Sequence, residues 1–423
     1  MVYTPRVIDK ELDELFSSLA AIAIEGPKGV GKTETASRRA STIHKLDEPE
    51  SLTIARGNPK RLLAGERPVL LDEWQRMPET WDLVRRAVDA GAPAGSFLLT
   101  GSASPDGGGR HSGAGRIVPV RMRPLSLAER LEDPGTVSLE ELLRGARPEL
   151  GGETSVSLED YTEEIVASGF PGFTDLDGRA LWAQLEGYID RVVDRDFPEL
   201  GHRVRNPAGL RRWMTAYAAA SSTSTSFEKI RDAASSGEGE KPSRVATQPY
   251  RDVLERLWIL DPVPAWQPTR NRLSRLNAAP KHQLADPALA AVLLGASGDA
   301  LLEGADLGPP VPRDGPLLGA LFESLVTQSI RVYAQSAEAR VGHLRTFAGD
   351  QEVDLIVERR DGRILAIEVK LARTIEDNDV RHLKWLAGKI GDELLDAVII
   401  TTGTAAYRRQ DGIGVVPAAL LAP

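Results

Sequence analysis

The chain has 423 residues, with 61 acidic and 52 basic side chains and no cysteine. This length exceeds the usual size of a single domain and predicts more than one. The net charge of −9 excludes a uniformly basic nucleic-acid coat, and the lack of cysteine excludes disulfides, thiolate metal sites and cysteine nucleophiles.

The first residues of the sequence carry several acidic side chains and no uninterrupted apolar run, which argues against a signal peptide. The longest apolar runs of the chain are far shorter than the roughly 20 residues that cross a bilayer. We therefore expect a cytoplasmic protein with no membrane partner.

Short apolar runs alternate with helical patterns in the N-terminal part of the chain. Each run is followed by a turn rich in Gly, Asp or Ser, which is typical of a buried strand, and the expected strands lie at 19–26, 67–73 and 95–102. Helical spacing predicts helices at Glu34–Ile43 and Thr80–Ala90. This alternation predicts an α/β fold with a parallel sheet covered by helices.

The sharpest motif follows the first expected strand and matches G-x-x-x-x-G-K-[ST]. It consists of Gly26, Pro27, Lys28, Gly29, Val30, Gly31, Lys32 and Thr33. Glycines let backbone N–H groups surround a phosphate, and the following helix presents its positive N-terminus. The lysine would reach the β- and γ-phosphates and the threonine hydroxyl would bind Mg²⁺. The motif predicts ATP and Mg²⁺ as ligands.

Supporting polar residues follow the next two strands. Asp72 and Glu73 end an apolar run, as in a Walker B motif, so Asp72 would hold Mg²⁺ and Glu73 would activate water. Thr100 ends the third run and would contact the γ-phosphate or the water. Arg116 is our first choice for the arginine that stabilises the transition state, with Arg110 second.

These motifs, together with the Gly115-Arg116 pair and the Arg123–Ser126 stretch, resemble a prokaryotic AAA-family group of P-loop ATPases that carries a C-terminal domain of unknown function. Three further segments resemble landmarks of its companion domain: Ser168–Gly172, Asp194–Phe197 and Pro280–Ala290. The resemblance covers most of the chain and implies an AAA-type fold and ATP binding.

The middle of the chain has mainly helical spacing. Leu181–Phe197 has a strong apolar stripe, and Phe227–Leu260 with the strands after it could form a winged helix. Basic residues form two clusters, namely Arg203, Arg205, Arg211 and Arg212, and Arg270, Arg272, Arg275, Lys281 and His282. We predict that they bind DNA; the alternatives are a solvated face and a protein interface.

The C-terminal part is predicted to be a small mixed α/β domain. Its expected helices are Leu317–Ala334 and Asn378–Lys389, and its expected strands lie at 343–347, 353–359, 364–370 and 397–403. Glu368 and Lys370 are two residues apart and share one face of a strand, and a hairpin would bring Asp354 beside them.

Asp354, Glu368 and Lys370 resemble the D…ExK signature of the PD-(D/E)xK nuclease superfamily. Two carboxylates are suitable ligands for Mg²⁺ or Mn²⁺, and the lysine would position water. Glu323 on the preceding helix would be a further metal ligand. The resemblance implies a nuclease-like fold that either cleaves DNA or binds it.

We predict three domains: an AAA-type ATPase at 1–130, a helical domain with a possible winged helix at 131–305, and a nuclease-like domain at 306–423. The leading hypothesis is a DNA-associated, Mg²⁺-dependent ATPase. The alternatives are a regulatory switch ATPase whose C-terminal domain only binds DNA or protein, and a scaffold NTPase without a nucleic-acid partner. Monomer and homo-oligomer stay open, because Arg116 could act in its own subunit or in a neighbour.

Overall fold

The computed structural model describes residues 3–102, 115–200, 206–235, 244–267, 279–305, 307–313, 315–346 and 349–423. The chain forms two compact units. Unit 1 comprises Met1–Arg123, Phe170–Gly172 and Arg256–Ile259, and unit 2 comprises Pro124–Gly169, Phe173–Glu255 and Leu260–Pro423. The domain boundaries that the sequence suggests near residues 130 and 305 stay predictions.

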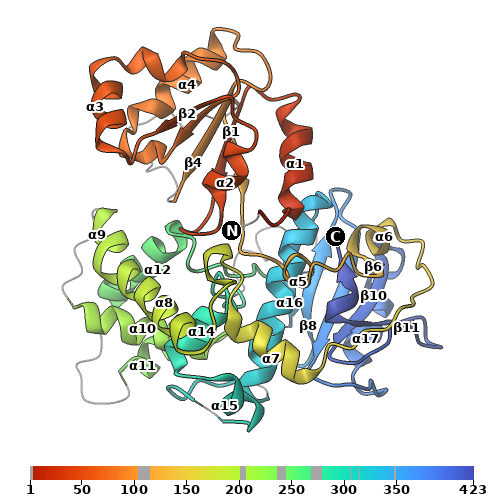
Figure 1. Ribbon diagram of the computed structural model, residues 1–423. Coiled ribbons are helices and arrows are strands. Elements are labelled where there is room, and N and C mark those ends of the chain that lie inside the picture. Colours follow the sequence, from red (N-terminus) through yellow and green to blue (C-terminus); the bar gives the residue numbers. More distant parts are fainter. Residues whose placement is uncertain are drawn as a thin grey trace. The chain divides into compact units, whose positions relative to one another are not determined.

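Unit 1 contains a parallel sheet in the order β2-β3-β4-β1-β5 (Figure 1). Its strands are β1 (Ala21–Glu25), β2 (Thr42–Lys45), β3 (Val69–Asp72), β4 (Phe97–Gly101) and β5 (Val118–Arg121). Its helices are α1 (Val7–Phe16), α2 (Lys32–Ser37), α3 (Pro49–Gly57) and α4 (Glu79–Asp89). The parallel sheet confirms the expected α/β fold, and β1, β3 and β4 confirm the three expected strands.

The strand order brings three chain segments to one edge of the sheet. Strand β4 lies between β1 and β3, and Thr100 is the register partner of both Ile24 and Asp72. Because all strands are parallel, their carboxyl ends meet at this edge. The loop after β1 and the residues after β3 and β4 therefore converge there.

One expected helix of this region is too long. The helix predicted at Glu34–Ile43 ends at Ser37, and Thr42–Lys45 forms the edge strand β2 instead. The side chains of β2 alternate between partial burial and exposure, as expected for an edge strand whose position is set by pairing with β3. Tertiary pairing here overrides local helical spacing.

Unit 2 begins with short elements and a set of helices. The short elements are α5 (Leu127–Leu131), β6 (Val137–Ser138) and α6 (Leu139–Arg144). The helices that follow are α7 (Leu158–Ala167), α8 (Gly178–Arg191), α9 (Phe197–Glu199), α10 (Pro207–Ala219), α11 (Phe227–Ala233), α12 (Arg244–Arg256), α14 (Pro287–Leu294) and α15 (Gly298–Leu302). Residues 260–263 pair with 281–284 as isolated antiparallel bridges, and the winged helix remains a prediction.

The C-terminal part of unit 2 is a mixed sheet in the order β11-β12-β10-β9-β8-β7. Its elements are α16 (Leu317–Ser336), β7 (Arg340–Arg345), β8 (Glu352–Glu358), β9 (Ile364–Lys370), α17 (Arg381–Ile390), β10 (Leu394–Thr401), β11 (Tyr407–Arg408), β12 (Gly414–Pro417) and β13 (Leu421–Ala422), the last of which pairs with β6. The order of helix, strands, crossover helix and strand confirms the expected mixed α/β domain.

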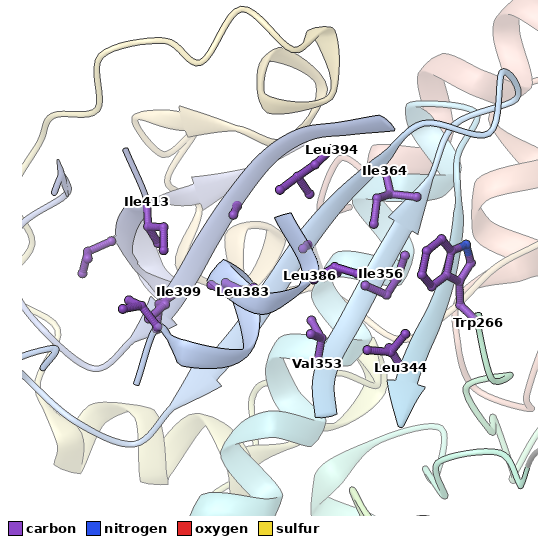
Figure 2. Packing of buried hydrophobic residues seen from close by; sticks show 14 of the residues in the cluster. Trp266, Leu344, Val353, Ile356, Ile364, Leu383, Leu386, Leu394, Ile399 and Ile413 are labelled. Carbon is purple, nitrogen blue, oxygen red and sulfur yellow. The ribbon is translucent and has the colours of Figure 1, made fainter. Parts of the chain in front are cut away.

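Apolar side chains of α17 fill one face of this sheet. Figure 2 shows Leu383 and Leu386 packed with Ile356 and Ile364, all of them buried. Burying such side chains stabilises the fold by roughly 1.5–3 kcal/mol each. Because side chains alternate along a strand, the face of β9 that carries Ile364 in this core carries Glu368 farther along.

Candidate nucleotide site and the C-terminal carboxylate cluster

The phosphate loop lies between β1 and α2 and depends on its glycines. Gly29 and Gly31 have φ angles of +80° and +99°, a region that only glycine adopts without strain. A Cβ on Gly26 would lie 2.1 Å from the carbonyl oxygen of Met122 at the end of β5. Glycine is thus required here both for the curl of the loop and for its close approach to β5.

Lys32 folds back onto this loop. Its Nζ donates hydrogen bonds to the carbonyl oxygens of Gly26 and Pro27, at 2.8 and 2.7 Å. Burial lowers the pKa of Lys32 to about 8, and the charges of Glu73 and Asp72 oppose that shift. The ammonium is therefore poorly compensated, and an incoming polyphosphate would supply the negative charge it lacks.

Asp72 collects two hydroxyl groups from neighbouring segments. Thr33 Oγ1 donates to Asp72 Oδ1 at 2.8 Å, and Thr100 Oγ1 donates to the same oxygen. Asp72 is buried at the carboxyl end of β3. Hard oxygen donors of this kind suit Mg²⁺, so this donor set fits the ion that the loop motif implies.

Glu73 has its side chain fixed beside Asp72. Its backbone is left-handed, with φ of +53°, and its Oε2 accepts a hydrogen bond from Gln75. Gln75 Nε2 also donates to Ser102 Oγ at 3.2 Å, which ties the carboxylate to the end of β4. Burial raises the pKa of Glu73, although the charge of Lys32 counteracts it. A raised pKa suits a carboxylate that must take up a proton.

Arg6 supports the loop, and no sequence motif identifies it. Its Nη1 donates to Val30 O at 3.0 Å and its Nη2 donates to Arg123 O at 2.7 Å. The side chain is buried. Arg6 thus connects the phosphate loop to the chain segment after β5. It precedes α1 as a single arginine, and a single arginine forms no recognisable sequence pattern.

Arg116 lies at the other edge of the sheet. Strand β5 starts at Val118 beside Ile22, so Arg116 precedes the amino end of the strand, whereas the phosphate loop follows the carboxyl end of β1. Five residues of strand correspond to about 16 Å. Arg116 Nε contacts Asp89 Oδ1 of α4 at 2.8 Å, and its side chain is 47% exposed. The role of Arg116 at the transition state stays a prediction, and Arg110 lies outside the described residues.

A phosphate loop, a hydroxyl-bonded aspartate and an adjacent glutamate at the carboxyl edge of a parallel sheet define a P-loop ATPase. The family comparisons agree: residues 19–131 match the family described as "AAA domain". Residues 158–300 and 318–421 match two families, each described as a domain of unknown function (DUF8612 and DUF4143). The chain is an ATPase with companion regions of these two kinds.

Two curated relatives resemble nearly the whole chain. Both are uncharacterized proteins, one from Mycobacterium bovis and one from Mycobacterium tuberculosis, and each is 26% identical over 407 residues, covering 94% of this chain and 80% of the relative. Among solved structures, the Walker-type ATPase of Pyrococcus abyssi aligns with a TM-score of 0.40 at 16% identity, over 67% of this chain and 94% of that one.

The second site is the carboxylate cluster of the C-terminal sheet. Strand β8 pairs with β9 so that Leu355 faces Ile367, which places Asp354 beside Glu368. Asp354 Oδ2 accepts from the backbone N–H of Val369 at 2.9 Å. Lys370 Nζ donates to Glu368 Oε2 at 3.1 Å. The structure therefore brings together the residues of the D…ExK pattern, as the hairpin predicted.

Lys281 enters this cluster from the middle of the chain. Its Nζ lies 2.9 Å from Glu323 Oε1, 3.0 Å from Asp354 Oδ1 and 3.4 Å from Glu352 Oε1. The side chain is fully buried. Burial alone would lower the pKa of Lys281, but the surrounding carboxylates hold it well above its ordinary value. A permanent ammonium thus occupies the space between the carboxylates.

The carboxylates of the cluster respond differently to this ammonium. Burial would raise the pKa of Asp354, but the charge of Lys281 lowers it to about 2. Burial raises the pKa of Glu323 to about 8 and that of Glu368 well above its ordinary range, and the nearby lysines only partly oppose these shifts. Burial thus disfavours the charged form of Glu368, whose Oε2 accepts a hydrogen bond from Lys370.

The C-terminal metal site stays a prediction, and the position of Lys281 bears on it. Within the described ranges, no group of three or more histidine, aspartate and glutamate side chains is arranged to hold a metal ion. Glu323, Asp354 and Glu368 do meet, but Lys281 supplies the positive charge that a metal would supply. The pattern of the sequence located the carboxylates, yet it could not show that a lysine about 40 residues upstream of the helix fills the space between them.

The basic clusters predicted for DNA are only partly described. Lys281 and His282 are buried, so they are not part of a surface patch. Arg203, Arg205, Arg270, Arg272 and Arg275 lie outside the described residues. Arg211 pairs with Asp190, and Arg212 is exposed.

In the part of the chain that the structure describes, none of the helices is long and apolar enough to cross a membrane.

Proposed function

We propose that the chain is a Mg²⁺-dependent ATPase whose nucleotide state controls what unit 2 binds, and whose C-terminal sheet binds its partner without cutting it. The observation that carries the first half is the pair of hydroxyls, from Thr33 and Thr100, on one oxygen of Asp72. The observation that carries the second half is the ammonium of Lys281 among the C-terminal carboxylates.

The residues at the phosphate loop have separate roles in ATP hydrolysis. Lys32 leaves the carbonyls of Gly26 and Pro27 and binds the phosphates, because charged oxygens are stronger acceptors than neutral carbonyls. Thr33 and Asp72 would hold Mg²⁺, which supplies charge neutralisation on the phosphate oxygens.

Glu73 is the proposed base. It takes a proton from the water that attacks the γ-phosphorus, while the bond from that phosphorus to the bridging oxygen breaks and ADP leaves. Gln75 holds the carboxylate toward Ser102, so that its orientation is set before the substrate arrives. Arg116, at the opposite edge of the sheet, would act only on the nucleotide of a neighbouring subunit.

The C-terminal sheet supports binding better than cleavage. Phosphodiester cleavage of the D…ExK type needs ionised carboxylates that hold a metal. Here burial raises the pKa of Glu368, and the buried ammonium of Lys281 pairs with Glu323 and Asp354. This favours the regulatory switch over an active nuclease.

DNA is the proposed partner of unit 2, with a protein partner as the alternative. The support is the sequence itself, since Arg270, Arg272 and Arg275 follow one another with no acidic residue among them. A cationic segment of this kind would bind phosphates in a salt-dependent way.

The decisive experiment measures ATP turnover with Mg²⁺, with and without single- and double-stranded DNA, beside a cleavage assay with Mn²⁺ on the same DNA. We expect turnover that Lys32→Ala lowers by at least about a hundredfold, salt-sensitive DNA binding, and uncut DNA. Turnover that survives Lys32→Ala would refute the ATPase site. DNA cleavage that Glu368→Ala abolishes would refute the binding-only role of the sheet.

A further inference from the structure

Three sequence landmarks that the ATPase site leaves unexplained form one connected structure. They are Arg123–Ser126, Ser168–Gly172 and Pro280–Ala290. In unit 2, Leu125 N donates to Gly169 O at 2.7 Å, and Gly169 N donates to Asp286 Oδ2 at 2.7 Å. Gly169 therefore joins all three landmarks through its backbone.

The connection at Gly169 is rigid for steric reasons. A Cβ on Gly169 would lie 2.6 Å from the carbonyl oxygen of Leu125, so only glycine fits. Ser168 before it is fully buried and has a φ of +74°, which surrounding contacts must maintain. Asp286 is also fully buried and caps α14, since its Oδ1 accepts from Ala288 N at 2.9 Å. Shifting Gly169 would therefore disturb the first turn of α14.

The chain leaves this anchor and joins unit 1 at the next residue. Phe170 is fully buried, and its Cδ1 lies 3.8 Å from the position that a Cβ on Gly29 would take. Pro171 Cγ lies 3.7 Å from the corresponding position on Gly31. Both glycines belong to the phosphate loop, and Gly31 directly precedes Lys32. Within unit 1, the Phe170-Pro171 pair thus rests on the backbone that must admit phosphate.

We propose that Phe170 and Pro171 are positioning residues of the nucleotide site and that they transmit its occupancy to unit 2 through Gly169 and Asp286. The proposal rests on the proposed function and names how the site is coupled. When Lys32 leaves the loop carbonyls for phosphate, the loop glycines change the surface beneath Phe170 and Pro171. Because Gly169 is bonded to Phe170 and fixed to Asp286, the displacement reaches α7, which ends one residue before Ser168, and the start of α14.

The test is hydrogen exchange on the full chain without nucleotide, with Mg²⁺-ADP, and with Mg²⁺ and a non-hydrolysable ATP analogue. In the wild type, we expect the analogue to change amide exchange in Leu158–Ala167 and Pro287–Leu294 by about tenfold. Phe170→Ala should abolish this difference and raise the KM for ATP about tenfold, and Phe170→Leu should restore part of both effects. Phe173→Leu is the matched control, because Phe173 packs edge-on against Tyr188 in unit 2, and it should keep the difference.

Asp286→Asn separates coupling from nucleotide binding. Asp286 anchors Gly169, and none of its hydrogen bonds among the described residues goes to the phosphate loop. We expect this variant to lose the exchange difference while its KM for ATP stays within about twofold of the wild type. Thermal unfolding of each variant checks that it folds.

The outcomes separate the two proposals. A chain that hydrolyses ATP through Lys32 but shows the same exchange in unit 2 with and without nucleotide overturns the coupling alone. Full nucleotide-dependent exchange in folded Phe170→Ala or in folded Asp286→Asn also overturns it. A chain without Lys32-dependent turnover overturns the proposed function instead.

Discussion

The molecule contains two lysine–carboxylate sites that differ in what the lysine contacts. At the phosphate loop, Lys32 donates to two neutral carbonyls and burial lowers its pKa to about 8. In the C-terminal sheet, Lys281 donates to the carboxyl groups of Glu323 and Asp354, and the surrounding acidic groups hold its pKa well above the ordinary value.

We infer from this difference that the phosphate loop is a ligand site and that the C-terminal cluster is a structural ion cluster. A buried ammonium whose hydrogen bonds go to carbonyls is only partly compensated by the acidic groups near it, so a polyphosphate improves its surroundings. A buried ammonium among carboxylates is already neutralised, and a metal ion would have to displace it. Four changes test this contrast, beginning with the largest expected effect.

Lys281→Met should destabilise unit 2 by about 3–5 kcal/mol, because it leaves buried carboxylates uncompensated. The measurement is thermal or urea unfolding at neutral pH. Lys384→Met is the matched control: Lys384 pairs with Asp411 on the surface at 2.9 Å, and its loss should cost less than about 1 kcal/mol. Equal losses in the two variants would show that Lys281 is not the structural centre of the cluster.

Glu73→Gln should lower ATP turnover about a hundredfold, because an amide cannot take the proton of the attacking water. Nucleotide binding should persist, since Lys32 and Thr33 are unchanged, and a fluorescent nucleotide titration checks this. In the wild type, turnover should fall toward acidic pH as Glu73 becomes protonated, at a pH above its ordinary pKa range. The control is Glu79→Gln, at an exposed position on α4, which should leave turnover unchanged. Loss of nucleotide binding in Glu73→Gln would contradict the proposed role of Glu73.

Glu323→Gln should change how stability depends on pH. The pKa of Glu323 is raised to about 8 in the folded state. Its contribution to the free energy of unfolding is therefore fully present below the pKa of the unfolded state and is lost as pH rises through about 8. Asp354 has a lowered pKa of about 2, so its contribution is lost only in strong acid. Between about pH 6 and pH 9, the melting temperature should fall less steeply with rising pH in Glu323→Gln than in the wild type. The exposed Glu338 gives the control variant Glu338→Gln, and an identical slope in all three proteins would contradict the assignment.

Arg116→Ala should have the smallest effect, with turnover within about twofold of the wild type in dilute protein. The reason is its position at the amino edge of the sheet, away from the phosphate loop. Arg85→Ala is the matched control, because Arg85 also contacts Asp89. A loss in Arg116→Ala that grows with protein concentration would instead show an arginine acting on a neighbouring subunit.

Much of the fold follows from local patterns. The strands before Gly26, Glu73 and Ser102 were predictable because each is an apolar run with a polar turn after it. The C-terminal helices and strands were predictable for the same reason. Strand β2 was not, because a four-residue edge strand has no buried face of its own and exists only through pairing with β3.

The two sites also differ in how far the sequence predicted them. The phosphate loop was predictable because its chemistry is written in consecutive residues, and Asp72 and Glu73 follow from strand order. The sequence could not predict the positions of three residues at these sites, because each acts through contacts with residues far away in the chain. They are Arg6, Phe170 and Lys281. No periodicity or spacing connects such positions.

The sequence by itself determined a P-loop ATPase region, an acidic chain without cysteine chemistry, and a C-terminal sheet carrying Asp354, Glu368 and Lys370. Only the tertiary structure decided that Lys281 neutralises those carboxylates and that Phe170 rests on the phosphate loop. The physical reason is that a local motif fixes which groups are near one another along the chain. The charge and burial that decide their chemistry come from whichever distant segment packs beside them.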